Sequence, residues 1–113
     1  MLIRPADALA RLPGPPNELW PGGARSASMF RHGTLELKLY APQGTDPQQP
    51  HTRDEVYVVV RGSGRFDHGG DVQRFEAGDT LFVPAGRAHR FIEFSEDFST
   101  WVMFYGPEGG EAP

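Results

Sequence analysis

The sequence contains no cysteine among its 113 residues. This absence excludes disulfide bonds, thiolate metal sites and cysteine nucleophiles together. Lysine occurs once, at Lys38, and the arginines are dispersed along a chain of net charge −4, so no basic run predicts a nucleic-acid partner. No stretch approaches the roughly 20 apolar residues of a membrane span, and we therefore expect no membrane partner.

The N-terminal residues 1–7 do not combine a basic start with an apolar core, so we expect no signal peptide and a cytoplasmic protein. A chain of this length forms one domain. Arg4 to Leu12 is compatible with one short helix, because Pro5 suits a first helical position and Leu9 and Leu12 lie three residues apart.

Glycine and proline are abundant, and they separate short apolar runs that read as strands. Strands are predicted at 27–31, 34–41, 55–61, 65–67, 72–76, 80–83, 89–94 and 98–105. No alternation of strands with helices occurs, so a parallel sheet is not expected. The pattern predicts an all-β fold, an antiparallel β-barrel or jelly roll with a short N-terminal helix. We divide the chain into a helix and irregular arm (1–26), the barrel (27–105) and a flexible tail (106–113), and expect Leu35, Leu37, Leu39, Val58 and Val83 among its buried positions.

One stretch combines an imidazole and a carboxylate, at His51 and Glu55, directly before a run of valines and a tyrosine. The run is typical of a buried strand. On one straight strand the four steps would hold the two side chains about 13 Å apart, and the valines argue against a helix. We therefore predict a bend at residues 52–54 that brings His51 and Glu55 into one site.

A second stretch repeats this arrangement. A turn at Gly78 and Asp79 leads into a short strand, the residues Pro84, Ala85 and Gly86 turn again, and His89 opens another apolar run. Two histidines and one carboxylate at such junctions could form a metal site of the facial-triad kind. A buried ion pair with a hydrogen-bonded histidine is the alternative, and the residues alone do not decide between the two.

The two stretches resemble the paired motifs of the cupin superfamily, and in particular its small single-domain members. The first family motif runs His-x-His, three or four residues, Glu, six residues, Gly; here it is met by His51, Glu55 and Gly62. The second runs Gly, five residues, Pro-x-Gly, two residues, His, three residues, Asn; here it is met by Gly78, Pro84, Gly86 and His89. The first histidine of the family is replaced by Gln49, and its asparagine by Glu93.

The resemblance implies a β-barrel that holds a divalent metal ion, such as iron, zinc, manganese or nickel, through His51, Glu55 and His89. Gln49 is expected to support these ligands rather than to bind the metal, because an amide oxygen is a weaker ligand than imidazole. Glu93 shares strand parity with His89 and is expected to face the same way. The other candidates for the wall of the cavity are aromatic: Tyr40, Tyr57, Phe82, Phe91 and Trp101.

Two functions remain open at this point. Three protein ligands would leave coordination positions free, as in family members that are dioxygenases or isomerases acting on a small polar metabolite. A non-catalytic cupin that only binds a small molecule is the alternative. We also expect a homodimer that forms through the edge strand at 27–31, which carries Met29 and Phe30.

Overall fold

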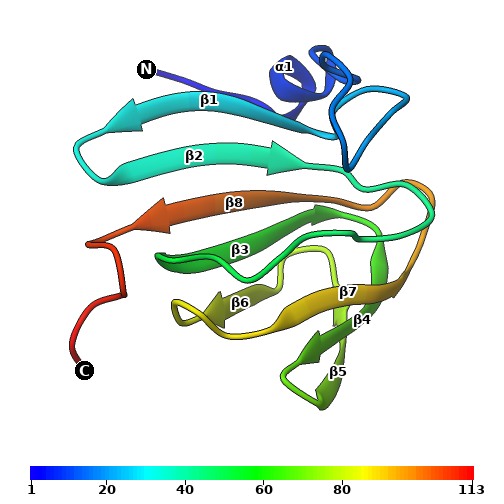
Figure 1. Ribbon diagram of the computed structural model, residues 1–113. Coiled ribbons are helices and arrows are strands. Elements are labelled where there is room, and N and C mark those ends of the chain that lie inside the picture. Colours follow the sequence, from blue (N-terminus) through cyan, green and yellow to red (C-terminus); the bar gives the residue numbers. More distant parts are fainter.

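The computed structural model describes all residues from 1 to 113 and contains one short helix and eight strands (Figure 1). The helix is α1 (Pro5–Leu9), and the strands are β1 (Ser26–His32), β2 (Leu35–Tyr40), β3 (Asp54–Arg61), β4 (Ser63–His68), β5 (Asp71–Glu76), β6 (Thr80–Val83), β7 (His89–Phe94) and β8 (Ser99–Tyr105). The predicted all-β class is therefore confirmed, with eight strands as expected. The helix is shorter than the predicted 4–12 and ends four residues before Pro13. No helix of the structure is both long enough and apolar enough to cross a membrane.

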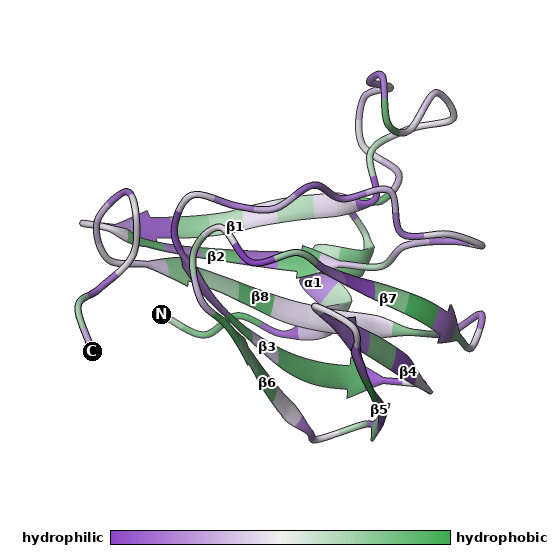
Figure 2. Ribbon diagram, turned by 60° about the horizontal axis from the view of Figure 1, so that its bottom comes forward, coloured by the Kyte–Doolittle hydropathy of each residue, from purple (hydrophilic) through white to green (hydrophobic).

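The strands form two antiparallel sheets arranged as a jelly roll. One sheet has the order β1-β2-β8-β3-β6 and the other the order β5-β4-β7. The core lies between them and is rich in aromatic rings, and Figure 2 shows hydrophobic residues running along β3 and β7. The buried core residues are Tyr40, Tyr57, Val59, Phe66, Phe75, Val83, Phe91, Phe98, Val102 and Phe104.

Strand β2 turns its polar face, not its leucine face, toward the interior of the jelly roll. Lys38 and Tyr40 line the same cavity as residues of β3, whereas Leu39 lies on the opposite face of the strand. Leu39 is fully buried there, and α1 packs on β1 and β2 and buries Ala8. Of the five positions predicted to be buried, Leu39 and Val83 are, while Leu35, Leu37 and Val58 are only half-buried on the outer face.

The two ends of the chain are attached to the body of the fold. Trp20, in the arm between α1 and β1, packs against the core. The tail after β8, which the sequence suggested would be flexible, donates backbone hydrogen bonds from Gly106 to Thr34 Oγ1 (3.0 Å) and from Glu111 to Asp54 Oδ2 (2.8 Å). A buried carboxylate that accepts backbone N–H groups can hold a polar segment that has no apolar side chains to bury.

Candidate metal centre

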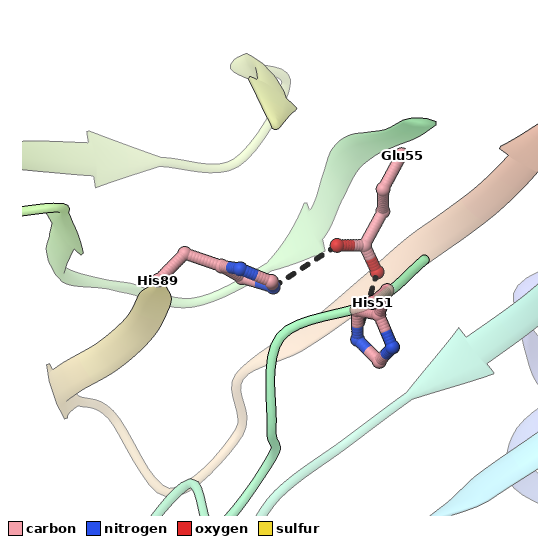
Figure 3. Close-up of side chains that lie close together, drawn as sticks. All are labelled: His51, Glu55 and His89. Atoms are coloured by element: carbon pink, nitrogen blue, oxygen red, sulfur yellow. Dashed lines mark ion pairs between the residues drawn. The ribbon is translucent and has the colours of Figure 1, made fainter. Parts of the chain in front are cut away.

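His51, Glu55 and His89 come together at one point, each from a different segment (Figure 3). His51 precedes β3, Glu55 is the second residue of β3 and His89 is the first residue of β7. Their ligand atoms lie within 4.8 Å of one another. The chain bends between His51 and β3, at residues 52 and 53, which agrees with the predicted bend at 52–54.

Backbone hydrogen bonds connect the two motif-bearing segments. The Gly86 N–H donates to the carbonyl of His51 (2.6 Å), and the Ala85 N–H donates to Asp54 Oδ1 (2.9 Å). The turn that leads to His89 is thereby held against the bend that precedes Glu55. Gly86 has a φ of +78°, a conformation that favours glycine and explains why this turn needs it.

Glu55 is the buried centre of the group. It is only 1% exposed, its Oε1 lies 3.0 Å from His89 Nε2, and its Oε2 lies 3.7 Å from His51 Nε2. Figure 3 shows its carboxylate between the two rings. A carboxylate removed from water in this way is costly unless a positive charge or a hydrogen-bond donor faces it.

The hydrogen bonds of His89 show what must face that carboxylate. Its Nδ1 lies 2.8 Å from the carbonyl of Arg87, so Nδ1 carries a proton and donates it. Its Nε2 lies 3.0 Å from the hydroxyl of Tyr57, which already donates to Gln48 (3.1 Å). In the neutral ring, Nε2, Glu55 Oε1 and the Tyr57 oxygen would be three acceptors facing one another, and either a proton on Nε2 or a cation would satisfy them.

The two imidazoles have pKa values that move in opposite directions. Burial lowers the pKa of His89, but the hydrogen bond to Glu55 and the Arg87 carbonyl outweigh it, and the pKa is raised overall. Burial lowers the pKa of His51, and the nearby positive charges of His89 and Lys38 lower it further. The negative charge of Glu55 raises this pKa but does not outweigh them. His51 is therefore neutral at physiological pH, the form in which imidazole binds metal.

Gln48 and Asp46 extend the group beyond its three ligand candidates. Gln48 Oε1 lies 3.2 Å from His51 Nε2, and its Nε2 donates to Asp46 Oδ2 (2.6 Å). Asp46 is 1% exposed and also accepts from the Tyr40 hydroxyl and the Phe91 N–H. Because Asp46 binds the amide nitrogen of Gln48, the oxygen of that amide must face the site.

The structure corrects several site residues proposed from the sequence. Gln49 is exposed, and its neighbour Gln48 supports His51 instead. Glu93 is exposed and pairs with Arg65 (3.2 Å), because the register of β7 against β4 shifts by one residue and reverses the parity from His89.

The aromatic candidates for the cavity wall divide into two groups. Tyr40 and Tyr57 line the cavity, as proposed. Phe91 lies deeper in the core, Phe82 is 50% exposed on the outer face of its sheet, and Trp101 is half-buried on that same face. The outward direction of Phe82 and Trp101 follows from strand parity. They pair with Val56 and Val58, which point outward because their neighbours Glu55 and Tyr57 point inward.

A cavity of about 190 Å³ opens beside His51 and Glu55. Polar groups of β2, β3 and the preceding loop form one part of it, and apolar residues of the N-terminal arm and β8 form the other. Its lining consists of Asn17, Leu19, Trp20, Ser26, Lys38, Tyr40, Gln48, His51, Glu55, Tyr57, Val102 and Phe104. Several of these were not proposed from the sequence, because the loop and the arm give no strand pattern that indicates the direction of a side chain.

The three side chains fit a divalent metal ion. Two metal–ligand bonds of about 2.0–2.2 Å span at most about 4.4 Å, so a small rotation of His51, whose side chain is 32% exposed, would bring the set together. The carbonyl of Arg87 orients His89, as is common for metal-binding histidines. A cation at this point would also satisfy Glu55 Oε1, which is buried and accepts no hydrogen bond while His89 is neutral.

Comparisons with known proteins agree with this fold. A family model described as Cupin domain matches residues 36–105. An uncharacterized protein of Streptomyces coelicolor, SCO3923, is 40% identical over 81 residues, which cover 70% of this chain and 77% of that protein. Among solved structures, protein NMB1881 of Neisseria meningitidis is 23% identical with a TM-score of 0.68, over 94% of this chain and 100% of that one. A cupin-2 domain protein of Shewanella frigidimarina is 18% identical with a TM-score of 0.61, over 72% of this chain and 79% of that one.

Proposed function

Because the chain belongs to the cupin domain family, we propose that it holds one divalent metal ion through His51, Glu55 and His89 and binds or acts on a small polar metabolite. The observation that carries this proposal is the buried Glu55 Oε1, which lies 3.0 Å from His89 Nε2 and is satisfied only by a proton on that nitrogen or by a cation. Two nitrogens and one carboxylate suit iron, zinc, manganese or nickel.

A metal ion bound by three protein ligands supplies Lewis acidity, and an iron(II) ion would supply redox chemistry as well. The protein supplies orientation and a defined protonation state. The Arg87 carbonyl orients His89, and Asp46 orients Gln48. Burial and then the charge of Glu55 raise the pKa of Tyr57 well above its usual value, so Tyr57 stays protonated and acts as a hydrogen-bond donor in the cavity, not as a base.

A cupin that binds a small molecule without turning it over is the second candidate. It is favoured by the protonated state of Tyr57, which removes Tyr57 as a general base beside the three candidate metal ligands. The two candidates differ in one respect: an enzyme loaded with metal consumes its substrate, whereas a binding protein returns it unchanged.

The test of the metal site is the metal content of protein purified without an affinity tag or chelator. We expect about one equivalent of a first-row divalent metal per chain, and much less in Glu55→Gln, which keeps the shape of the side chain but not its charge. Circular dichroism checks that the variant is folded. A parent protein that holds no metal after purification, and takes up none when iron, zinc, manganese or nickel is added, would contradict the proposal.

We also propose the homodimer expected from the sequence. β1 is an edge strand of the five-stranded sheet, and Met29 and Phe30 on it are half-buried in the single chain. A second copy could cover them and pair the free strand edge. Sedimentation would show twice the mass of 12.5 kDa, and a monomer at high protein concentration would remove this proposal. The cytoplasmic location stays a prediction.

A further inference from the structure

Lys38, the one lysine of the chain, faces the cavity beside the candidate metal centre. Lys38 and His51 also line a second, neighbouring opening of about 240 Å³. The acidic neighbour Glu36 is already bound by Arg31 (2.9 Å) and Arg53 (3.3 Å). Lys38 itself takes part in none of the ion pairs of the structure, so its ammonium group is available to a ligand.

Apolar side chains line the rest of the cavity, and one of them, Val102, pairs with Lys38 across β2 and β8. Trp20 and Leu19 reach it from the N-terminal arm, and Val102 and Phe104 reach it from β8. Leu19 is 52% exposed, so a ligand in the cavity would cover apolar surface that the protein alone leaves in water. The cavity thus combines the ammonium group of Lys38 and the carboxylate of Glu55 with an apolar surface.

The volume limits the size of the occupant. About 190 Å³ is the share of roughly six water molecules in the liquid. Cavities that bury drug-sized ligands measure roughly 300–1,000 Å³. The cavity can therefore enclose a small molecule, and a larger ligand would extend out of it.

We propose that this cavity recognises a small monocarboxylic acid with a flat or compact apolar part. The carboxylate pairs with Lys38 next to His51, and the apolar part lies against Trp20 and Phe104. This inference names the class of molecule that the cavity binds. It rests on the proposed function for the claim that the bound acid is a substrate or ligand of the metal centre. The absence of an ion-pair partner supports it, because the ammonium group of Lys38 is free to pair with a carboxylate of a ligand.

The experiment compares two probes of nearly the same shape, benzoate and its uncharged analogue benzamide. Both are titrated into the metal-free protein in the presence of EDTA, and binding is followed by the indole N–H signals in ¹⁵N-edited NMR spectra. The chain has two tryptophans. Trp20 lines the cavity and its signal should shift, whereas Trp101 lies on the outer face of the sheet and its signal should not.

We expect benzoate to bind about 10-fold more tightly than benzamide, the size of one charge-assisted hydrogen bond. Lys38→Met should remove this preference and Lys38→Arg should retain it. Arg90→Met is the matched control, because it changes the net charge by the same amount at an exposed position of β7 and should leave the preference intact.

Three results would overturn the inference. They are equal binding of the two probes, a preference for benzoate that survives Lys38→Met, and no shift of the Trp20 signal at saturating benzoate. Metal titration of the parent protein is measured separately. If benzoate binds through Lys38 but the protein takes up no metal, the carboxylate site stands and the proposed metal function falls.

Discussion

Replacing Asp46 by alanine should destabilise the fold and loosen the candidate metal centre, because its carboxylate joins three segments. It accepts hydrogen bonds from the Tyr40 hydroxyl at the end of β2 (2.5 Å), from Gln48 Nε2 in the following loop (2.6 Å) and from the Phe91 N–H in β7 (2.9 Å). The residue is 1% exposed, so water cannot take its place without a rearrangement.

The magnitude follows from the donors that would be left without a partner. The Phe91 N–H is in a buried strand and cannot turn away, which costs about 1–3 kcal/mol, and the charge-assisted bond of Tyr40 is worth about 1.5–3 kcal/mol. Gln48 lines the cavity and can turn to water, so we assign it no cost. The sum is about 2.5–6 kcal/mol, a large part of the roughly 5–15 kcal/mol that stabilises a typical domain.

Urea unfolding followed by tryptophan fluorescence, in EDTA, measures this loss without a contribution from metal binding. Asp79→Ala is the matched control. Asp79 also accepts a backbone hydrogen bond, from the Glu76 N–H (2.8 Å), but it is exposed and water can replace it, so we expect a loss of about 1 kcal/mol or less. If Asp46→Ala loses no more stability than Asp79→Ala, the proposed role of Asp46 is wrong.

Two further predictions concern the metal centre. Gln48→Ala should weaken metal binding, because the Gln48 amide oxygen lies 3.2 Å from His51 Nε2, the nitrogen that faces Glu55, and would therefore lie beside a bound cation. Gln49→Ala should have no effect, because Gln49 is exposed, and calorimetry that ranks the two variants the other way would refute this. Metal affinity should fall as the pH drops below neutral. Burial lowers the pKa of His89, but the hydrogen bonds to Glu55 and to the Arg87 carbonyl outweigh it and raise this pKa above 6.5. Protons therefore compete with the metal for Nε2 of His89 near neutral pH. An affinity that is unchanged between pH 8 and pH 6 would argue against ligation by imidazole.

The strands were predictable because their signals are local. β6 and β7 have the predicted bounds of 80–83 and 89–94, and β3 begins one residue earlier than predicted. Each contains several β-branched or aromatic residues and is flanked by turn-forming residues, and that pattern depends on no distant contact. The spacing of Glu55 and His89 within their motifs also placed them at the starts of strands.

The incorrect predictions for Glu93 and Gln48 come from features of the fold that a single sequence does not show. The parity argument for Glu93 fails because the register of β7 against β4 shifts between Phe91 and Glu93, and such a bulge leaves no clear mark in the sequence. Gln48 was missed because residues 42–50 form a loop, where no period indicates which side chain points inward.

The buried face of β2 was assigned incorrectly for another reason. The leucines of the alternating segment 35–39 predict a core face, but α1 covers that face at Leu39 and the polar face turns to the cavity. A short helix that packs on the outside of a sheet creates a second apolar layer. Alternation alone cannot tell this layer from the core between the sheets.

Calorimetric titration of metal into the apo protein tests the central claim most directly, when His89→Ala is compared with His32→Ala. Both variants lose one imidazole, but His32 is exposed at the end of β1 and away from the three converging residues. We predict one binding site in the parent and in His32→Ala, and no stoichiometric binding in His89→Ala, with all three proteins folded by circular dichroism. Binding by His89→Ala as tight as that of the parent would contradict the metal centre proposed here.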